Sequence, residues 1–331
     1  GLVTVNKTRT LRGAQAGVDA RSRVATESIL SNSQGMSVSA SNVVIDGFTI
    51  QDSSNAAFTG YGVWLNPGVD GTQILNNVFQ NNIVGLNIAN AGTTQALVQH
   101  NLFKTNNLPG GAGGTGIYFD QYTSGVVSNV LIDANAFDGN ANAGIGLNGD
   151  PTSFSSNFEI SNNALDSNGR GIYASAVTSI SIHDNTIGNS TSPTDGGTSV
   201  AIAAYGGVSG MSILNNDLLT GAMYGIRVAN FVGPGAENTD VQAHYNNITG
   251  YAAAGLTNQD VKRVDATCNW WGAASGPTTP ANPGGTGDFL VGDAIFNPWL
   301  IAPAPGGACV RDAPKPVPAR QITSPSAISR S

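Results

Sequence analysis

Charged residues are scarce in this sequence of 331 residues. They make up 11% of the chain, and glutamate, a good helix former, occurs only at Glu27, Glu159 and Glu237. Glycine, in contrast, occurs 43 times. This composition disfavours helices and favours short strands joined by tight turns. Because 40% of the residues are hydrophobic and recur periodically, the chain has enough apolar side chains to bury a large core.

Clustered basic residues and long apolar runs are also missing. The net charge is −7, and the 14 Lys and Arg residues form no patch, which argues against a nucleic-acid partner. No run of about 18 apolar residues occurs, so we expect no membrane span. The chain begins at Gly1 with no recognisable signal peptide, and we interpret it as a processed or truncated product.

Cysteine occurs only twice, at Cys268 and Cys309. Two cysteines do not suggest a metal site, and nothing else in the sequence indicates a metal or a cofactor. We expect the pair to form one disulfide in an oxidising compartment.

A repeated sequence motif extends along most of the chain. Ile74-Leu75-Asn76-Asn77-Val78-Phe79 is followed by Gly85-Leu86-Asn87-Ile88, and the same pattern returns along most of the chain. Its asparagines are 22 to 34 residues apart. Where this interval is longer than 22 residues, the additional residues are rich in Gly, Ser, Thr and Pro. A short coil of fixed length with loops added at its corners is typical of a solenoid. The repeat asparagines are Asn77, Asn101, Asn135, Asn163, Asn185, Asn216 and Asn247.

The repeat predicts an all-β fold, a single-stranded right-handed parallel β-helix of about ten coils. Aliphatic side chains would point inward, and strands of successive coils would pair in parallel. We expect each repeat asparagine at a sharp turn, because asparagine tolerates left-handed backbone geometry and its amide can bond neighbouring backbone. Stacked on one another, these amides would form a ladder.

The coils resemble the repeats of the pectin-lyase-like superfamily. The closing motifs Cys268-Asn269-Trp270-Trp271-Gly272 and Phe296-Asn297-Pro298-Trp299-Leu300 are similar to a C-terminal signature of extracellular and cell-surface β-helix proteins. The resemblance implies a secreted or cell-surface location. It leaves the activity open, because the superfamily includes lyases, hydrolases, epimerases, adhesins and surface-layer proteins.

We predict a β-helix over residues 1–301, including a C-terminal cap over about 268–301, and an extended tail rich in Pro, Ala and Ser over 302–331. Trp270 and Trp271 are interpreted as part of the cap. A Cys268–Cys309 bridge would attach the tail to the last coil.

The middle residue of each Gly-aliphatic-x-aliphatic strand should point outward. In successive coils these middle residues form an outward-facing column. Aromatic rings can stack on sugar faces, and polar side chains can bond hydroxyl groups, so this column predicts a polysaccharide-binding surface. The alternative is that aromatic residues are present only because they favour strands. The candidate binding residues are Trp64, Asn87, Tyr118, Tyr173 and Arg227.

Catalytic candidates are fewer. Asp120 and Asp150 come from adjacent coils, and a glycoside hydrolase needs two carboxylates about 5–9.5 Å apart. Both border inserted loops, so the alternative is that they are surface residues at turns. Arg227 has no cluster of aspartates beside it in the sequence, as a lyase with an arginine base would need.

Two functions remain. We favour a secreted or cell-surface structural protein, a rod in a coat, filament or adhesion layer that contacts copies of itself through its ends or tail. The alternative is a polysaccharide-acting enzyme, a lyase, hydrolase or epimerase that uses the outward column.

Overall fold

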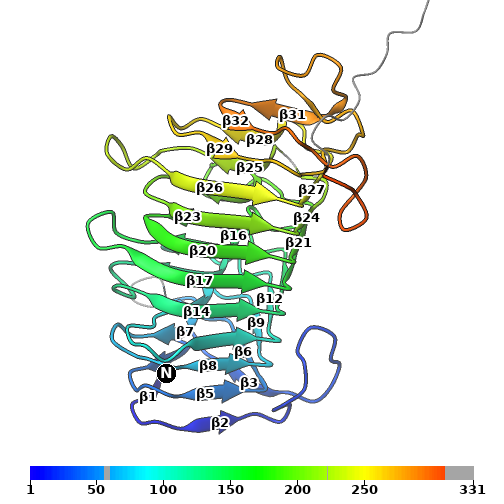
Figure 1. Ribbon diagram of the computed structural model, residues 1–331. Helices are drawn as coiled ribbons and strands as arrows, with labels where there is room; N and C mark the ends of the chain where they lie inside the picture. Colours follow the sequence, from blue (N-terminus) through cyan, green and yellow to red (C-terminus); the bar gives the residue numbers. More distant parts are fainter. Residues whose placement is uncertain (56–59, 222, 310–331) are drawn as a thin grey trace, which may run out of the picture.

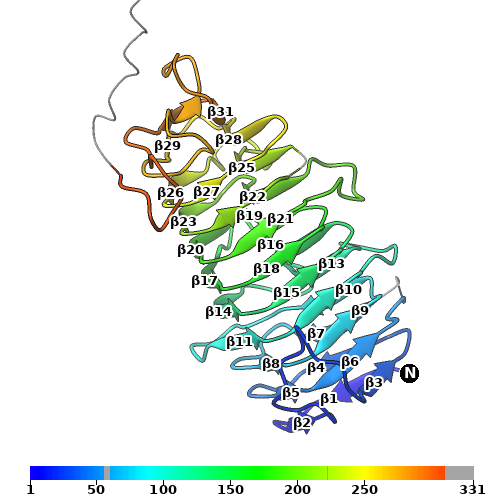
Figure 2. The same cartoon turned by 90° about the vertical axis from the view of Figure 1, so that its right-hand side faces the viewer.

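The computed structural model describes residues 1–55, 60–221 and 223–309, and all its regular elements there are β-strands. The strands form three parallel sheets along one rod, with the N-terminal strands at one end and the C-terminal strands at the other (Figures 1 and 2). We call these sheets A, B and C. The chain contributes one strand to each of them in turn and then begins the next coil. This is the predicted right-handed parallel β-helix.

Sheet A holds twelve strands, which are β1 Val3–Val5, β4 Met36–Val38, β7 Tyr61–Leu65, β10 Val84–Asn87, β13 Thr115–Asp120, β16 Ala143–Asn148, β19 Ile172–Ser175, β22 Val200–Ala204, β25 Tyr224–Val228, β28 Ala254–Asn258, β31 Gly287–Val291 and β30 Pro277–Thr278. Sheet B holds eleven, which are β2 Thr10–Arg12, β5 Val44–Asp46, β8 Gln73–Leu75, β11 Ala96–Gln99, β14 Ser128–Asp133, β17 Ser155–Ser161, β20 Val177–His183, β23 Ser209–Leu214, β26 Thr239–His244, β29 Val264–Asp265 and β32 Ala294–Ile295. Sheet C holds nine, which are β3 Ser28–Ser31, β6 Phe48–Gln51, β9 Val78–Gln80, β12 Leu102–Lys104, β15 Ala136–Asp138, β18 Ala164–Asp166, β21 Thr186–Gly188, β24 Asp217–Leu218 and β27 Asn247–Ile248.

The core is made of side-chain columns that run along the rod. In sheet C, Phe79, Phe103 and Phe137 occupy one register position on successive strands. Their rings stack with centroids 4.7 and 4.9 Å apart and are buried. This spacing is that of paired strands, so the register of the sheets fixes the packing of the core.

From β8 to β27 the corner between sheets B and C is short and uniform. Two residues join each strand pair from β8–β9 to β26–β27. The first of them has left-handed geometry, as at His100, Ala134 and Asp184, with φ of 57°, 52° and 55°. The prediction that the repeat asparagine takes this geometry is therefore wrong, since the residue before it does.

The repeat asparagine is the second residue of that corner, and its amide lies inside the rod. The side chain of Asn101, for example, donates to Oδ1 of Asn135 at 3.0 Å and to the carbonyl of Ile74 at 2.8 Å. The ladder contains Asn77, Asn101, Asn135, Asn163, Asn185, Asn216, Asn246 and Asn269.

Asn247 was wrongly predicted as a ladder member, because Asn246 takes that position. The side chain of Asn247 instead donates to Asp217 and to the carbonyl of Ala304. A second ladder of buried amides, not expected from the sequence, follows the end of the sheet C strands through Asn82, Asn106, Asn140 and Asn168.

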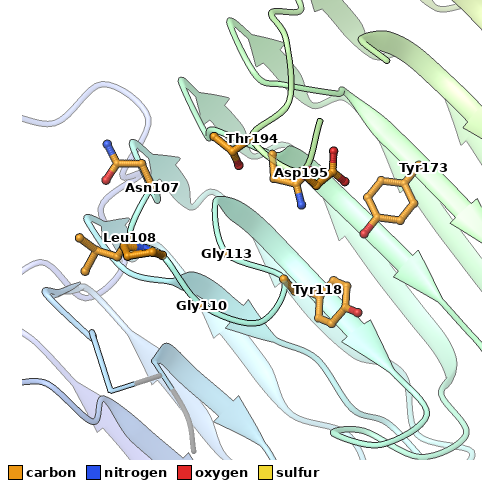
Figure 3. A pocket seen from close by; sticks show the side chains of 11 residues that line it. Asn107, Leu108, Gly110, Gly113, Tyr118, Tyr173, Thr194 and Asp195 are labelled. Atoms are coloured by element: carbon orange, nitrogen blue, oxygen red, sulfur yellow. The ribbon is translucent and has the colours of Figure 1, made fainter. Parts of the chain in front are cut away.

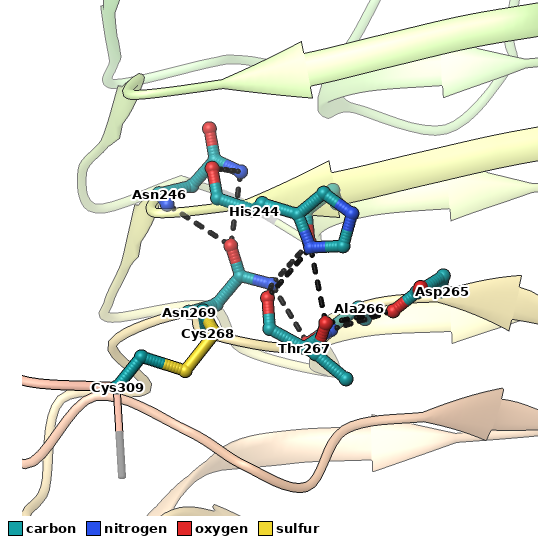
Figure 4. Close-up of a disulfide and its surroundings, with 9 residues drawn as sticks. His244, Asn246, Asp265, Ala266, Thr267, Cys268, Asn269 and Cys309 are labelled. Atoms are coloured by element: carbon teal, nitrogen blue, oxygen red, sulfur yellow. Dashed lines mark hydrogen bonds between the residues drawn. A yellow bond between two sulfur atoms is a disulfide. The ribbon is translucent and has the colours of Figure 1, made fainter.

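The C-terminal end is closed by the residues after β29. Trp271 is fully buried at the end of the core, whereas Phe289 and Ile295 remain half exposed. The expected disulfide joins Cys268 to Cys309 and attaches the segment after Leu300 to the last coil (Figure 4). The rest of the predicted tail, residues 310–331, lies outside the described residues. Within the described ranges no helix is long and apolar enough to cross a membrane.

Candidate functional site

The predicted outward column lies on the outer face of sheet A. Strand register places Trp64 beside Asn87, Asn87 beside Tyr118, and Arg227 at the same position further along. Gly146, Tyr173 and Ala203 occupy the strands between. The candidate binding residues therefore share one column, which crosses seven strands from β7 to β25.

The N-terminal part of this column is covered by the loop that follows β13. Trp64 Nε1 donates to the carbonyl of Thr123 at 2.9 Å, and Asn87 Nδ2 donates to Ser124 Oγ at 3.0 Å. Asn87 is fully buried as a result. Contrary to the prediction, Asn87 supports this loop and is not open to a ligand.

The central part of the column lines a cavity of about 530 Å³ (Figure 3). Tyr118 and Tyr173 lie on one side, and the loop from Asn107 to Gly113 lies on the other. The ring of Tyr173 lies across Gly146, where an added Cβ would be only 2.6 Å from the ring carbon Cζ. Glycine at this position therefore lets the tyrosine lie against the sheet.

An aromatic row continues from Tyr173 toward the C-terminal end. The ring centroid of Tyr205 lies 6.0 Å from that of Tyr173 and 5.3 Å from that of Phe231. Arg227 lies over Phe231, and these residues line a second cavity of about 370 Å³. The two cavities share Tyr173 and Asp195, so they are parts of one groove, which we call the sheet A groove.

An ion pair between Arg170 and Asp195 forms part of this groove. The guanidinium donates two hydrogen bonds of 2.9 Å to the carboxylate, and it donates a third to Asn142. Asp195 belongs to the loop between β21 and β22, so the pair ties this loop to sheet A. Burial alone would raise the pKa of Asp195, but hydrogen bonds from Arg170 and from the Gly197 N–H outweigh it and lower the pKa.

The two carboxylates predicted as catalytic candidates accept hydrogen bonds from residues of the turns in which they lie. Asp120 accepts hydrogen bonds from the backbone of Tyr122 and Thr123 and from the Tyr118 hydroxyl. Asp150 accepts two from Thr152, at its backbone N–H and its hydroxyl. Both positions fit the alternative interpretation, in which aspartates stabilise tight turns.

The buried tyrosine hydroxyls are suited to hydrogen bonding. Burial raises the pKa of Tyr118 and of Tyr173, so both phenols stay protonated at neutral pH. The Tyr173 hydroxyl can donate to a ligand oxygen, whereas the single hydroxyl hydrogen of Tyr118 is already donated to Asp120, and neither phenol is a good base. Within the part of the chain that the structure describes, no three His, Cys, Asp or Glu side chains gather as a metal site.

Sequence reasoning missed Tyr205, Phe231, Asp195 and the pairing of Arg170. The first two follow the ends of β22 and β25, outside the repeated sequence motif, and Asp195 lies in an inserted loop. The cluster of aromatic residues just after sheet A strands was the available signal for Tyr205 and Phe231.

The three parallel sheets, to which each coil of the chain contributes one strand in turn, define a right-handed parallel β-helix protein. The model of the family described as "Right handed beta helix region" matches residues 28–218, and the chain belongs to this family. A search of curated proteins finds no match.

Two solved structures are similar in fold. The Dettilon tailspike protein (gp208) has a TM-score of 0.51 and 14% identity, over 88% of this chain and 60% of the tailspike chain. A GH136 lacto-N-biosidase from Eubacterium ramulus has a TM-score of 0.46 and 12% identity, over 81% of this chain and 60% of the other. This chain therefore spans about 60% of the length of each of these structures.

Proposed function

We propose that this protein binds a polysaccharide along the sheet A groove. The observation that carries the proposal is the continuous row of Tyr173, Tyr205 and Phe231, with centroids 5.3 to 6.0 Å apart. Successive strands of a sheet are about 4.8 Å apart, which is comparable with the length of one sugar unit. Neighbouring rings can therefore stack on neighbouring sugars, while Asn142 and Thr194 offer hydrogen-bonding groups.

The proposal is one of binding without cleavage. Asp120 and Asp150 already accept hydrogen bonds from their own loops, and Asp195 is held ionised by Arg170. A general acid must be protonated at the working pH, which a carboxylate with a lowered pKa is not. Appearance of new reducing ends in a bound polysaccharide would instead support the alternative, a polysaccharide-acting enzyme.

We also propose an extracellular or cell-surface location. The support is the Cys268–Cys309 disulfide, since such bonds persist mainly in oxidising compartments.

A binding screen on immobilised neutral and acidic polysaccharides tests the proposed function. We expect Tyr173→Ala and Tyr205→Ala each to weaken binding about tenfold, as losses of central aromatic contacts commonly do. Tyr245→Ala is the matched control, because Tyr245 is exposed at the corner between sheets B and C. Failure of the wild-type protein to bind any polysaccharide would overturn the proposal.

A structural role through self-association is a second candidate, supported by the N-terminal end of the rod. In the described chain β1, β2 and β3 each pair on one side only. Between them Leu11, Leu30 and Phe48 line a largely apolar cavity of about 430 Å³. Strand edges and apolar surface that no further segment of the chain covers favour pairing with another chain.

Because residues 268–309 cover the other end, such a contact would join two N-terminal ends rather than stack rods head to tail. Light scattering over a range of concentrations tests it. We expect a dimer in the wild-type protein and a monomer in Ile29→Asp, because Ile29 is 61% exposed at this end. A wild-type monomer at every concentration would contradict it.

A further inference from the structure

The guanidinium of Arg227 is a cation without an acidic partner in the sheet A groove. Its Nε donates to Gln259 Oε1 at 3.0 Å, and its Cζ lies 5.3 Å and 5.0 Å from the ring centroids of Tyr224 and Phe231. Among the described residues, Arg227 forms no salt bridge and its two terminal nitrogens donate no hydrogen bond. The two rings therefore hold the guanidinium group of Arg227 in place, and its two terminal nitrogens are available to donate hydrogen bonds to a ligand.

Arg170 in the same groove differs in this respect. Its terminal nitrogens donate to Asp195 and Asn142, so its charge is balanced within the protein, although its buried Nε has no hydrogen-bond partner among the described residues. The Arg170–Asp195 pair adds no net charge to the groove. Arg227 then gives the C-terminal half of the groove, the cavity of about 370 Å³, a net positive charge.

The N-terminal half of the groove, the cavity of about 530 Å³, has no such positive charge. Its cavity is lined by the neutral side chains of Tyr118, Asn142 and Thr194, and the carboxylate of Asp120 lies beside the Tyr118 hydroxyl at 3.1 Å. Four strand steps separate Tyr118 from Arg227 in sheet A, which corresponds to about 19 Å. With a net charge of −7 on the whole chain, a ligand charged at every unit would be repelled along most of this length.

Resting on the proposed function, we infer that the ligand is a sparsely acidic heteroglycan. A carboxylate, sulfate or phosphate substituent of one sugar binds the terminal nitrogens of Arg227, and uncharged sugars occupy the cavity at Tyr118 and Tyr173. An arginine fork matches such oxyanions through two parallel hydrogen bonds. Cation–π contacts with the rings of Tyr224 and Phe231 fix the orientation of the guanidinium.

A glycan microarray with three groups of probes tests this inference. The groups are neutral glycans, heteroglycans with single uronate, sialate, sulfate or phosphate groups, and polyanions charged at each sugar. We expect the second group to bind best. Within that group, the carboxylate, sulfate and phosphate probes identify the kind of anion.

Three variants separate the charge of Arg227 from its packing. Arg227→Gln should lose about tenfold in affinity for the sparsely acidic glycans, which is the scale of one charge-assisted contact, and should lose clearly less in affinity for neutral glycans. Arg227→Lys keeps the positive charge and should retain part of the preference. Arg263→Gln is the matched control, since Arg263 pairs with Asp293 and does not line the groove.

The outcomes distinguish the inferred class of ligand from the proposed binding of polysaccharide. Binding of neutral glycans alone, a preference for polyanions, or an equal loss of neutral and acidic binding in Arg227→Gln would each overturn the inference and leave the proposed function standing. Absence of binding to all probes would overturn both. Thermal unfolding of each variant checks that the fold is retained.

Discussion

The side-chain amide of Asn246 donates a hydrogen bond to Oδ1 of Asn269 at 2.9 Å, and the amide of the next residue, Asn247, does not take part in this ladder. Asn246 is fully buried and also donates to the carbonyls of Ile213 and His244. Adjacent asparagines thus have different structural roles.

We predict that Asn246→Ala is much more destabilising than Asn247→Ala. The first substitution leaves several buried backbone groups without partners, and each unsatisfied group costs about 1–3 kcal/mol, so we expect a loss of roughly 3 kcal/mol or more. The second removes partly exposed contacts and should cost about 1 kcal/mol. Urea unfolding measures both, and equal losses would contradict the assignment of the ladder.

The Arg170–Asp195 pair predicts a pH dependence of stability. The pKa of Asp195 is lower in the folded protein than its usual value near 3.9, so the unfolded chain binds the proton more readily. The stabilisation is therefore present above about pH 4 and is lost as the pH falls through the lower folded pKa.

Thermal unfolding of the wild type and Asp195→Asn across pH measures this effect. The difference in melting temperature should be constant above about pH 5 and should shrink below about pH 4. A difference that stays the same down to pH 2 would show that the ion pair does not contribute.

Gly146→Ala should weaken polysaccharide binding while the fold persists. The new Cβ would lie 2.6 Å from Cζ of Tyr173, which must then move away from the sheet. We expect binding to fall by about the same factor as in Tyr173→Ala, roughly tenfold. Binding assays and circular dichroism test this, and Gly188→Ala is the control because only ordinary contacts surround that position, with the nearest atoms 3.8 Å away.

Removal of the disulfide should loosen the C-terminal end. The two cysteines are 41 residues apart, and the chain-entropy estimate for a loop of this length is about 4 kcal/mol. In Cys309→Ser, hydrogen exchange should increase first in residues 268–309 and much less in β14 and β17. The reduced wild type should behave in the same way, and unchanged exchange in both proteins would show that the cap is held by packing alone.

The sequence was sufficient for the fold because the aliphatic positions repeat at each coil. Stacked side chains such as Phe79, Phe103 and Phe137 impose the same residue type at the same register, and that repetition is visible without coordinates. The position of the amide ladder at Asn246 was not visible, because both members of an Asn-Asn pair satisfy the pattern. The hydrogen bonds of the corner decide between them.

The groove could be predicted only in part. The outward column containing Tyr118, Tyr173 and Arg227 follows from strand alternation alone. Asp195 lies in an insertion between coils, and its contact with Arg170 depends on how that loop folds over sheet A. The cover over Asn87 comes from another such loop, so the same limitation explains why its burial was not foreseen.

The short corner between sheets B and C has an evolutionary consequence. Two residues and a ladder amide fix this corner in each coil from β8 to β27, so it cannot gain or lose residues without displacing the core. In these coils the other two corners carry the insertions, among them the segments around Asn107 and Asp195 that border the groove. Ligand preference can thus diversify by exchange of loops at these two corners while the scaffold stays unchanged.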